Sequence, residues 1–293
     1  MSKNKIKHLI EDLTIDEGLI ETGIEGVKLF RITECHRCAP AVYEPTVVAI
    51  LSGSKEAILD GKHYLYDNSQ YMCCSVSMPV EAGTPDASPD NPLLGVYISL
   101  DTRVMTQLAI EIESAAGAIS APKSSTLPQG FALAHWDETF TDALLRLLQL
   151  VGQPADAAVL GRSRLRELYY AVLKGEAGDS ARRAFGVGNE IAQVIKLLSS
   201  SSNQTMSVEK MAQHAGMSRA VFHRKFKQAT TLSPIQFVKS MRLNKAAMMI
   251  AEGISVSEAA LNVGYESPSQ FSREFKRAHG QSPKQWCLAK ASN

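Results

Sequence analysis

The sequence contains no apolar run that approaches the ~18–20 residues a membrane-spanning helix requires. Its first residues, MSKNKIKHLIEDLTIDEGLIE, hold isolated lysines and acids but no continuous apolar stretch of the kind found in secretory signals. Five cysteines, an odd number, do not make a disulfide framework. We therefore expect a protein of the reducing cytoplasm with no membrane partner.

Motifs of several enzyme classes are also missing. The sequence has no P-loop, no G-x-S-x-G and no H-E-x-x-H. His8, His36 and His63 do not form an H-x-H…H metal-binding arrangement. The sequence therefore predicts a protein that is not an enzyme and that carries no cofactor or metal.

The cysteines of the first half allow two interpretations. Cys35 and Cys38 form a C-x-x-C pair, and Cys73 and Cys74 lie downstream. Such thiols can hold zinc or sense oxidants. However, adjacent residues of a strand point to opposite faces, so Cys73 and Cys74 do not easily join one tetrahedral site. Packing of small buried side chains is the favoured interpretation, and a metal or thiol sensor is the alternative.

Charge divides the chain into two parts of opposite sign. Residues 1–188 contain 17 basic and 24 acidic residues, whereas residues 189–293 contain 14 basic and only 6 acidic residues. A basic segment of this kind is typical of a part that meets a polyanion.

Two stretches within the basic segment are near copies of each other. They are MSRAVFHRKFKQATTLSPIQF, which begins at Met217, and YESPSQFSREFKRAHGQSPKQW, which begins at Tyr265. Two copies are too few for a solenoid. The sequence therefore predicts a duplicated supersecondary unit.

Each copy has the pattern of a helix-turn-helix, at about residues 207–228 and 255–278. Gly216 and Gly264 supply turns that need a positive φ. Serines are placed to cap the first helix of each unit (Ser207 and Ser255) and the second (Ser218 and Ser267). Phenylalanines four residues apart face the core from each second helix: Phe222 and Phe226, then Phe271 and Phe275.

The opposite faces of the two second helices, which we call the reading helices, carry side chains suited to DNA. Arg bonds guanine bidentately, Gln bonds adenine, and Lys pairs with phosphate. Together with the charge, this favours double-stranded promoter DNA as partner. The predicted DNA-binding residues are Ser218, Arg219, Ala220, His223, Arg224 and Lys227 in the first unit, and Ser267, Ser269, Gln270, Ser272, Arg273 and Lys276 in the second.

The connector between the units predicts one helix from Pro234 to Glu252. Its length, roughly 28 Å at 1.5 Å per residue, is close to the ~34 Å between successive major-groove faces. One chain could thus place both reading helices on one side of the duplex.

The first half of the chain predicts short strands followed by helices. Residues 27–33, 45–51 and 93–100 are β-rich, and Asp60-Gly61 is a hairpin turn signal. Such strands suggest a sandwich or a barrel. Apolar residues at helical spacing then predict helices within residues 102–114, 135–151 and 156–175. The glycine-rich stretch 175–188 is typical of a linker.

These residues resemble a known family. The segment from about Asn189 resembles the AraC/XylS class of bacterial transcription regulators, most specifically in ALNVGYESPSQFSREFKRAHGQSP, from Ala260 to Pro283. Residues 44–82 and 135–154 are similar to the cupin-like N-terminal arm of one AraC subgroup, which binds a small effector or dimerises. The first helix-turn-helix unit departs mildly from the family pattern, since Ala220 and His223 occupy positions where larger or amide side chains often face DNA. The resemblance also implies RNA polymerase as a partner.

We therefore predict an α+β multidomain protein, with a cupin-like β-barrel and trailing helices at residues 1–175, a linker at 176–188, and an all-α domain of two helix-turn-helix units at 189–290. The predicted function is sequence-specific transcription regulation, modulated by a small-molecule effector in the N-terminal domain, with a homodimer possible. Three alternatives stay open: a thiol- or metal-responsive regulator using Cys35 and Cys38, a constitutive regulator whose barrel only dimerises, and a barrel enzyme with an incidental DNA domain.

Overall fold

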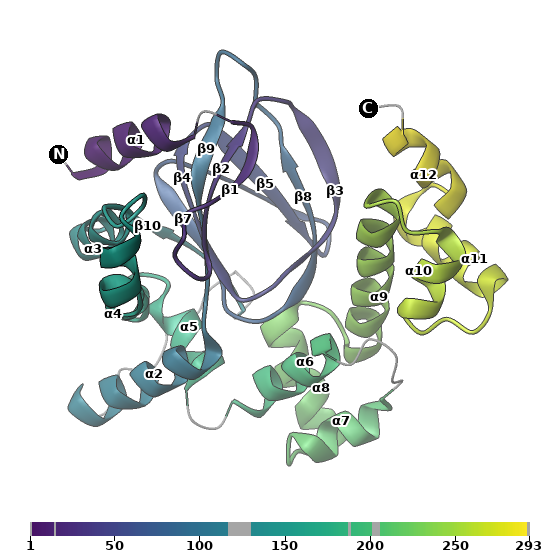
Figure 1. The fold of residues 1–293 in the computed structure, drawn as a ribbon. Helices are drawn as coiled ribbons and strands as arrows, with labels where there is room; N and C mark the ends of the chain where they lie inside the picture. Colours follow the sequence, from purple (N-terminus) through teal and green to yellow (C-terminus); the bar gives the residue numbers. More distant parts are fainter. Residues whose placement is uncertain (1, 15, 117–129, 187–188, 201–205, 292–293) are drawn as a thin grey trace.

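The computed structural model describes residues 2–14, 16–116, 130–186, 189–200 and 206–291. A sheet-rich N-terminal part occupies the centre of the molecule, with helices α1 to α5 on one side and below (Figure 1). The helices of the C-terminal part pack against the other side of the sheets, in green and yellow (Figure 1). None of the described helices is long and apolar enough to cross a membrane.

Ten strands form two antiparallel sheets among the described residues. The larger sheet has the order β1-β2-β9-β4-β7-β10 and the smaller one β3-β8-β5-β6. No strand pairing joins the two sheets within the described ranges, so they form an open two-sheet arrangement rather than a closed barrel. The strands are β1 (Gly18–Glu21), β2 (Val27–Ile32), β3 (His36–Tyr43), β4 (Thr46–Ser52), β5 (Ser54–Leu59), β6 (Lys62–Asp67), β7 (Gln70–Cys74), β8 (Met78–Thr84), β9 (Leu93–Ser99) and β10 (Phe131–His135).

The residue types of the strands fit their positions in the sheets. Strand β4 pairs with β7 and β9 on its two sides and is buried almost throughout, as its run of β-branched and apolar residues favours. Strands β5 and β6 form the predicted hairpin, in which Leu59 pairs with Lys62. Asp60 and Gly61 both have a positive φ in this turn, 49° and 73°, as a two-residue hairpin loop of mirror-image type requires.

The three helices predicted in the N-terminal part are confirmed, and the structure adds two more, α1, which buries Ile6 and Ile10, and α5. The helices are α1 (Ser2–Leu13), α2 (Thr102–Ala116), α3 (Glu138–Leu148), α4 (Pro154–Lys174), α5 (Gly178–Phe185), α6 (Glu190–Ser200), α7 (Val208–His214), α8 (Arg219–Thr230), α9 (Pro234–Ala251), α10 (Val256–Asn262), α11 (Pro268–His279) and α12 (Pro283–Ala291).

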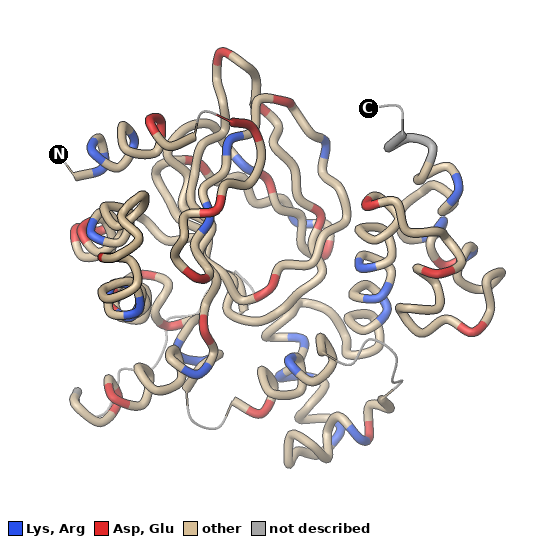
Figure 2. Tube along the Cα trace, viewed as in Figure 1, with Lys and Arg blue, Asp and Glu red and all other residues tan. Residues whose placement is uncertain are grey.

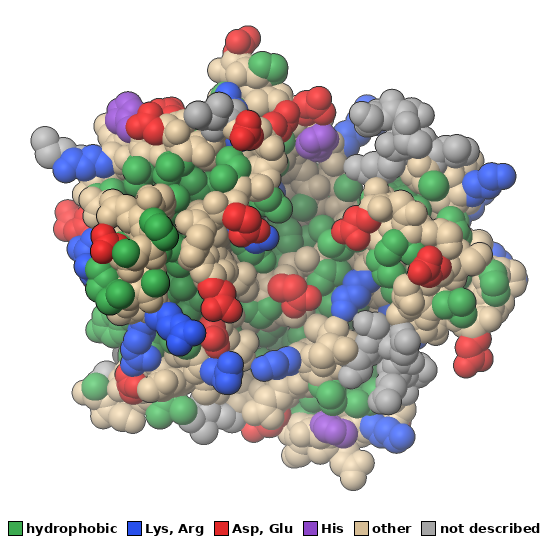
Figure 3. Space-filling view, in the orientation of Figure 1, with side chains coloured by type: hydrophobic (Ala, Val, Ile, Leu, Met, Phe, Trp, Pro, Cys, Tyr) green, Lys and Arg blue, Asp and Glu red, His purple; other side chains and the backbone are tan. Residues whose placement is uncertain are grey.

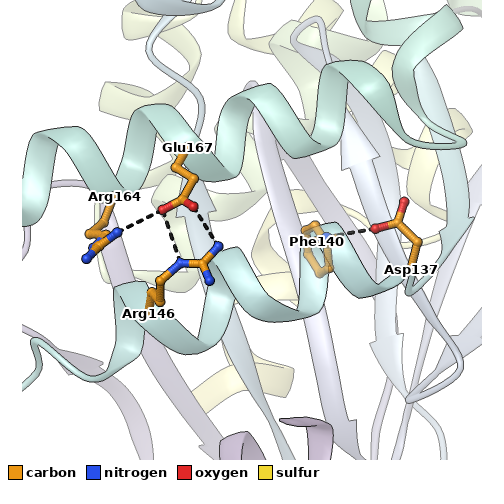
Figure 4. A network of polar contacts seen from close by, with 5 residues as sticks. All are labelled: Asp137, Phe140, Arg146, Arg164 and Glu167. Carbon is orange, nitrogen blue, oxygen red and sulfur yellow. Dashed lines mark hydrogen bonds and ion pairs between the residues drawn. The ribbon is translucent and has the colours of Figure 1, made fainter.

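Helices α3 and α4 lie side by side and are joined by a small ion-pair network (Figure 4). Arg146 of α3 reaches both oxygens of Glu167 on α4, at 2.6 and 3.3 Å, and Arg164 adds a third contact at 3.1 Å. Hydrogen bonds from Arg146 hold the pKa of the Glu167 carboxyl below its usual range. Asp137 caps α3 by accepting from the Phe140 N–H at 2.7 Å. Phe140 of α3 also stacks on Tyr71 of β7, with ring centroids 4.0 Å apart, so the pair lies over the larger sheet.

The predicted linker, residues 176–188, is not an open chain where it is described. It contains α5, whose Ala181 and Phe185 are buried. A Cβ on Gly178 would lie 2.2 Å from the Leu173 carbonyl oxygen, and one on Gly186 would lie 2.5 Å from the Arg182 carbonyl oxygen. These two glycines thus permit close packing, which composition alone cannot distinguish from flexibility.

Two hydrophobic cores divide the molecule. The first is continuous from the sheets through α6 and α7 to Phe222 and Phe226 of the first helix-turn-helix unit and Phe237 of α9. The second is smaller and joins the C-terminal half of α9 to Phe271 and Phe275 of the second unit. The first unit is therefore packed into the body of the protein, whereas the second is a module carried by α9.

Candidate nucleic-acid interface

The two helix-turn-helix units share one backbone geometry. Gly216 and Gly264 both adopt a positive φ, 59° and 82°. The residues that follow them, Met217 and Tyr265, donate backbone hydrogen bonds to the carbonyls of Ala212 and Ala260, each at 2.9 Å. All four serines predicted as caps accept from the N–H three residues on: Ser207, Ser218, Ser255 and Ser267.

The reading helices also end alike. Thr231 after α8 and Gly280 after α11 are both left-handed, with φ of 67° and 74°. Their N–H groups donate to the carbonyls of Lys227 and Lys276. Glycine adopts this conformation readily, whereas a β-branched threonine pays a steric cost there. The first unit therefore carries backbone strain that the second lacks.

Buried phenylalanines orient each reading helix. Phe222, Phe226, Phe271 and Phe275 are all 0% exposed. Phe226 packs edge-on against Phe237 of α9, with ring centroids 5.2 Å apart, and Phe275 does the same with Trp286 of α12 at 6.1 Å. Because these rings are anchored, the opposite face of each reading helix is turned outward.

The structure places ten of the twelve predicted DNA-binding residues on the exposed surface, and Ser267 and Ser272 are half-buried. The exposed residues are Ser218, Arg219, Ala220, His223, Arg224 and Lys227 on or beside α8, and Ser269, Gln270, Arg273 and Lys276 on α11. Lys225 and Arg277 are two further exposed basic residues on the same helices; their charge was the signal that could have indicated them.

Some of these side chains already have partners. Arg219 pairs with Glu209 of α7 at 2.9 Å, and both are largely exposed. The Ser267 hydroxyl, besides capping α11, lies 3.0 Å from that of Ser269. No ion pair involves Arg224, Lys227, Arg273 or Lys276 within the described residues, so their charge is available to a polyanion. Figure 2 shows Lys and Arg recurring along α8 and α9, with acids more frequent around the sheets.

Helix α9 joins the units and also holds them to the N-terminal part. Its 18 residues span about 27 Å, close to the predicted helix. Asn244 near its middle is buried, and its amide nitrogen donates to the carbonyls of Ala41 on β3 and Val80 on β8, each at 2.9 Å. The next residue, Lys245, donates to the Ser199 carbonyl of α6 at 2.7 Å. Asn244 was not predicted as a functional residue; its only signal in the sequence is a polar side chain among the apolar positions of the connector.

A polar network links α9 to the second reading helix. The Glu274 carboxylate accepts from Lys239 of α9 and from the Tyr265 hydroxyl, both at 2.9 Å, and from the Gln270 amide at 3.4 Å. Burial raises the pKa of Glu274, but these hydrogen bonds outweigh it, so the pKa lies below its usual value and the group is ionised at neutral pH. Neither Glu274 nor Lys239 was predicted from the sequence as a functional residue.

A cavity of about 420 Å³ lies between the two parts of the chain. Glu44, Ser75 and Val76 line it from the sheets, and α2 contributes Thr102 and Thr106. On its other side it is lined by Phe185, Ile195 and Lys196 and by further residues of α5 and α6. A molecule bound there would touch the N-terminal part and α6 at once.

The cysteines do not gather into a site among the described residues. Cys73 and Cys74 are buried in β7, and burial raises the pKa of the Cys73 thiol to about 12. Burial and the neighbouring Glu56 also raise the pKa of the Cys38 thiol to about 12, and its sulfur lies 3.2 Å from that carboxylate. No described group of three or more His, Cys, Asp or Glu side chains is placed to hold a metal. A thiol at such a pKa is mostly protonated at neutral pH and is a poor nucleophile.

Comparison with known proteins decides the family. Residues 23–180, more than half of the chain, match the family described as AraC-type transcriptional regulator N-terminus. The chain belongs to the AraC-type transcriptional regulators. Residues 211–288 of this AraC-type chain also match a helix-turn-helix domain family; the match covers the second unit and all of the first except its first few residues.

Relatives of this AraC-type protein match mainly its C-terminal part. It is 42% identical over 81 residues to the HTH-type transcriptional regulator MtrA of Neisseria gonorrhoeae, over 27% of each chain. An uncharacterized HTH-type transcriptional regulator of Haemophilus influenzae is 40% identical over 80 residues, again 27% of each chain. These alignments thus span about a quarter of the relatives' length.

Solved structures of ToxT from Vibrio cholerae share the overall fold. One gives a TM-score of 0.57 at 12% identity, covering 89% of this chain and 97% of that chain. The structure of unsaturated fatty acid bound wild-type ToxT gives 0.53 at 11% identity, covering 89% and 94%. At these identities the likeness concerns the fold alone: an N-terminal sheet domain followed by a helical helix-turn-helix domain.

Proposed function

We propose that this protein is a sequence-specific DNA-binding transcription regulator in which α8 and α11 enter successive segments of the major groove. The observation that carries the proposal is the duplicated unit, with equivalent exposed faces on α8 and α11 and one helix of about 27 Å between the copies. That length is close to the ~34 Å that separates successive major-groove faces on one side of a duplex.

The two units supply side chains of the same kind at equivalent positions. Arg224 and Arg273 are exposed one turn into each reading helix and suit bidentate contacts to guanine. Lys227 and Lys276 lie at the last turns and suit phosphates, which position the protein without reading sequence. We assign the remaining predicted residues to contacts around these four.

Selection of bound duplexes from a random pool tests this function. Wild-type protein should enrich a bipartite sequence, and Arg224→Ala and Arg273→Ala should each relax preference in a different half of it. Leu19→Ala, at an exposed position of β1 and outside both reading helices, supplies a control that should leave the selected sequence unchanged. Enrichment of no sequence, or identical effects of the two arginine variants, would contradict the assignment.

The proposal includes a small-molecule effector that binds in the cavity between the two parts. Its volume suits a small organic ligand, and α6, which forms one wall, is tied to α9 through Lys245 and Ser199. An effector that favours one arrangement of α6 would shift the population of DNA-binding conformations. ToxT, which shares the fold, has been solved with an unsaturated fatty acid bound.

Promoter occupancy measured with and without a panel of small metabolites tests the effector. A compound that changes occupancy should lose its effect in Ala192→Phe, which fills the cavity from α6, while DNA binding without compound is kept. If every compound leaves promoter occupancy and transcription unchanged, the effector proposal is wrong and the protein is a constitutive regulator.

We also keep the homodimer as a proposal. Apolar side chains gather over α3 and α4 on the face shown in Figure 3, and Val159 and Leu160 of α4 are 79% and 38% exposed. Exposed apolar residues of this kind are found at protein interfaces. Size-exclusion chromatography of the full chain should give a dimer that Val159→Asp dissociates, and a monomeric wild type would exclude it. RNA polymerase stays a predicted partner.

A further inference from the structure

The second reading helix carries a carboxylate at a place where bases would be read. Glu274 lies four residues after Gln270 on α11, so the two side chains share a helix face. Lys239 and Tyr265 hold one oxygen of this carboxylate at 2.9 Å each. The other oxygen accepts from the Gln270 amide nitrogen at 3.4 Å, a long hydrogen bond between two side chains of one helix.

Lys239 and Tyr265 fix the carboxylate in place. Lys239 is on α9 and Tyr265 is in the turn before α11, and both side chains are partly or largely buried. Glu274 is therefore attached to the connecting helix and to the turn, and its free oxygen points to Gln270 from a fixed position. Gln270 itself is exposed, and its side chain has no other hydrogen-bond partner among the described residues.

This arrangement decides which way the Gln270 amide faces. With the amide nitrogen towards the carboxylate, one N–H is engaged, and one N–H and the carbonyl oxygen stay free. The opposite orientation would bring the amide oxygen against a carboxylate oxygen, and two acceptors repel each other. Gln270 thus offers one donor and one acceptor to a base.

One donor beside one acceptor matches adenine and not guanine. In the major groove adenine presents the N7 acceptor and the N6 amino donor, whereas guanine presents two acceptors, N7 and O6. An amide with both hydrogens free can turn them towards guanine, but an amide with one hydrogen held by Glu274 cannot. We propose that Glu274, fixed by Lys239 and Tyr265, is a positioning residue that makes Gln270 select adenine against guanine. This inference rests on the proposed function, because it needs α11 in the major groove.

The experiment begins from the duplex that full-length wild-type protein selects from a random pool. The position at which Gln270→Ala loses its preference is the one that Gln270 reads. Competition binding at fixed salt then compares adenine and guanine at that position. Wild type should prefer adenine by about tenfold, within the range for one bidentate contact.

Three variants separate positioning from structure. Glu274→Ala should bring the adenine-to-guanine ratio to about twofold or less and leave the other positions unchanged. Glu274→Gln keeps an acceptor oxygen and should keep most of the ratio. Lys239→Met keeps the carboxylate but removes one of its two anchors, so the ratio should fall part of the way towards that of Glu274→Ala. An unchanged ratio in Glu274→Ala, or an equal loss in Glu274→Gln, would overturn the inference.

A measurement on the wild type needs no variant to fold. Replacement of the adenine by 7-deazaadenine removes the N7 acceptor and should weaken binding about as much as guanine does. No loss with 7-deazaadenine would overturn the inference while leaving the proposed function intact. If the wild type selects no sequence at all, both fail, so the two failures are distinguishable.

Discussion

Replacement of Asn244 tests how the DNA-binding helices are attached to the N-terminal part. In the folded protein its buried amide donates two hydrogen bonds of 2.9 Å, to Ala41 on β3 and to Val80 on β8, two residues that pair across the sheet. Each buried bond contributes about 1 kcal/mol net, and a carbonyl left without a partner adds to the loss. Asn244→Ala should therefore weaken this attachment by about 2–3 kcal/mol.

Hydrogen exchange of the β3 and β8 amides measures that loss. If these amides exchange when α9 separates from the sheet, a loss of 2–3 kcal/mol makes them exchange about 30- to 150-fold faster. DNA binding should persist, because the reading side chains lie on the exposed surface and not against the sheet. Met248→Ala, at an exposed position of the same helix, is the matched control and should leave exchange unchanged. Equal exchange in Asn244→Ala and wild type would refute the reasoning.

The remaining predictions concern the helix-turn-helix units. Arg273→Ala should cost about 1–3 kcal/mol of specific binding and relax the preference for one base. Lys276→Ala should weaken binding to all sequences and reduce the salt dependence of binding by about one unit of slope. If the two variants give equal salt titrations, these roles are wrongly assigned. Phe275→Ala should destabilise the second unit by about 3–5 kcal/mol, since the ring is fully buried, and a urea melt with an unchanged midpoint would disprove it. Thr231→Gly should stabilise the protein by about 0.5–1 kcal/mol by relieving a left-handed threonine, and a lower melting temperature would contradict that. Burial lowers the pKa of His279, so below its ordinary pKa of about 6.5 the unfolded chain binds a proton more readily than the folded one. Stability should therefore fall as the pH drops from 7 towards 5, and His279→Gln should flatten the fall.

The helix-turn-helix units could be predicted because their determinants are local. Ser218 and Ser267 precede their helices by one residue, and Phe271 and Phe275 lie one turn apart, so sequence spacing alone places them. The same holds for the Asp60-Gly61 hairpin, where two left-handed residues select the turn. In each case the physical cause acts within a few residues of the signal.

Features that depend on contacts between distant parts of the chain could not be predicted from the sequence. Helix α5 packs against α2, which lies far earlier in the chain, so a packed helix was interpreted as a linker. Asn244 has its partners on strands more than 160 residues away, and Glu274 gains its role from Lys239 on another helix. The order of the strands within the two sheets is likewise non-local.

The twelve predicted DNA-binding residues fall between these cases. Helical periodicity placed most of them on the exposed faces of α8 and α11, and the local cap motif also named Ser267, which is half-buried. Periodicity did not indicate that Arg219 pairs with Glu209 or that the Gln270 amide donates a hydrogen bond to Glu274, because those partners depend on how the helices pack. Sequence spacing thus predicted which helix faces are exposed, and packing decides which hydrogen-bond donors, acceptors and charges each side chain has free for DNA.

Footprinting of the full-length protein on its selected duplex tests the central claim most directly. Two helix-turn-helix units on one face of DNA should protect two segments whose centres lie about 10–10.5 base pairs apart. Gln270→Ala and Arg224→Ala should each weaken protection of a different segment. A single protected segment, or no protection at low ionic strength, would contradict the account.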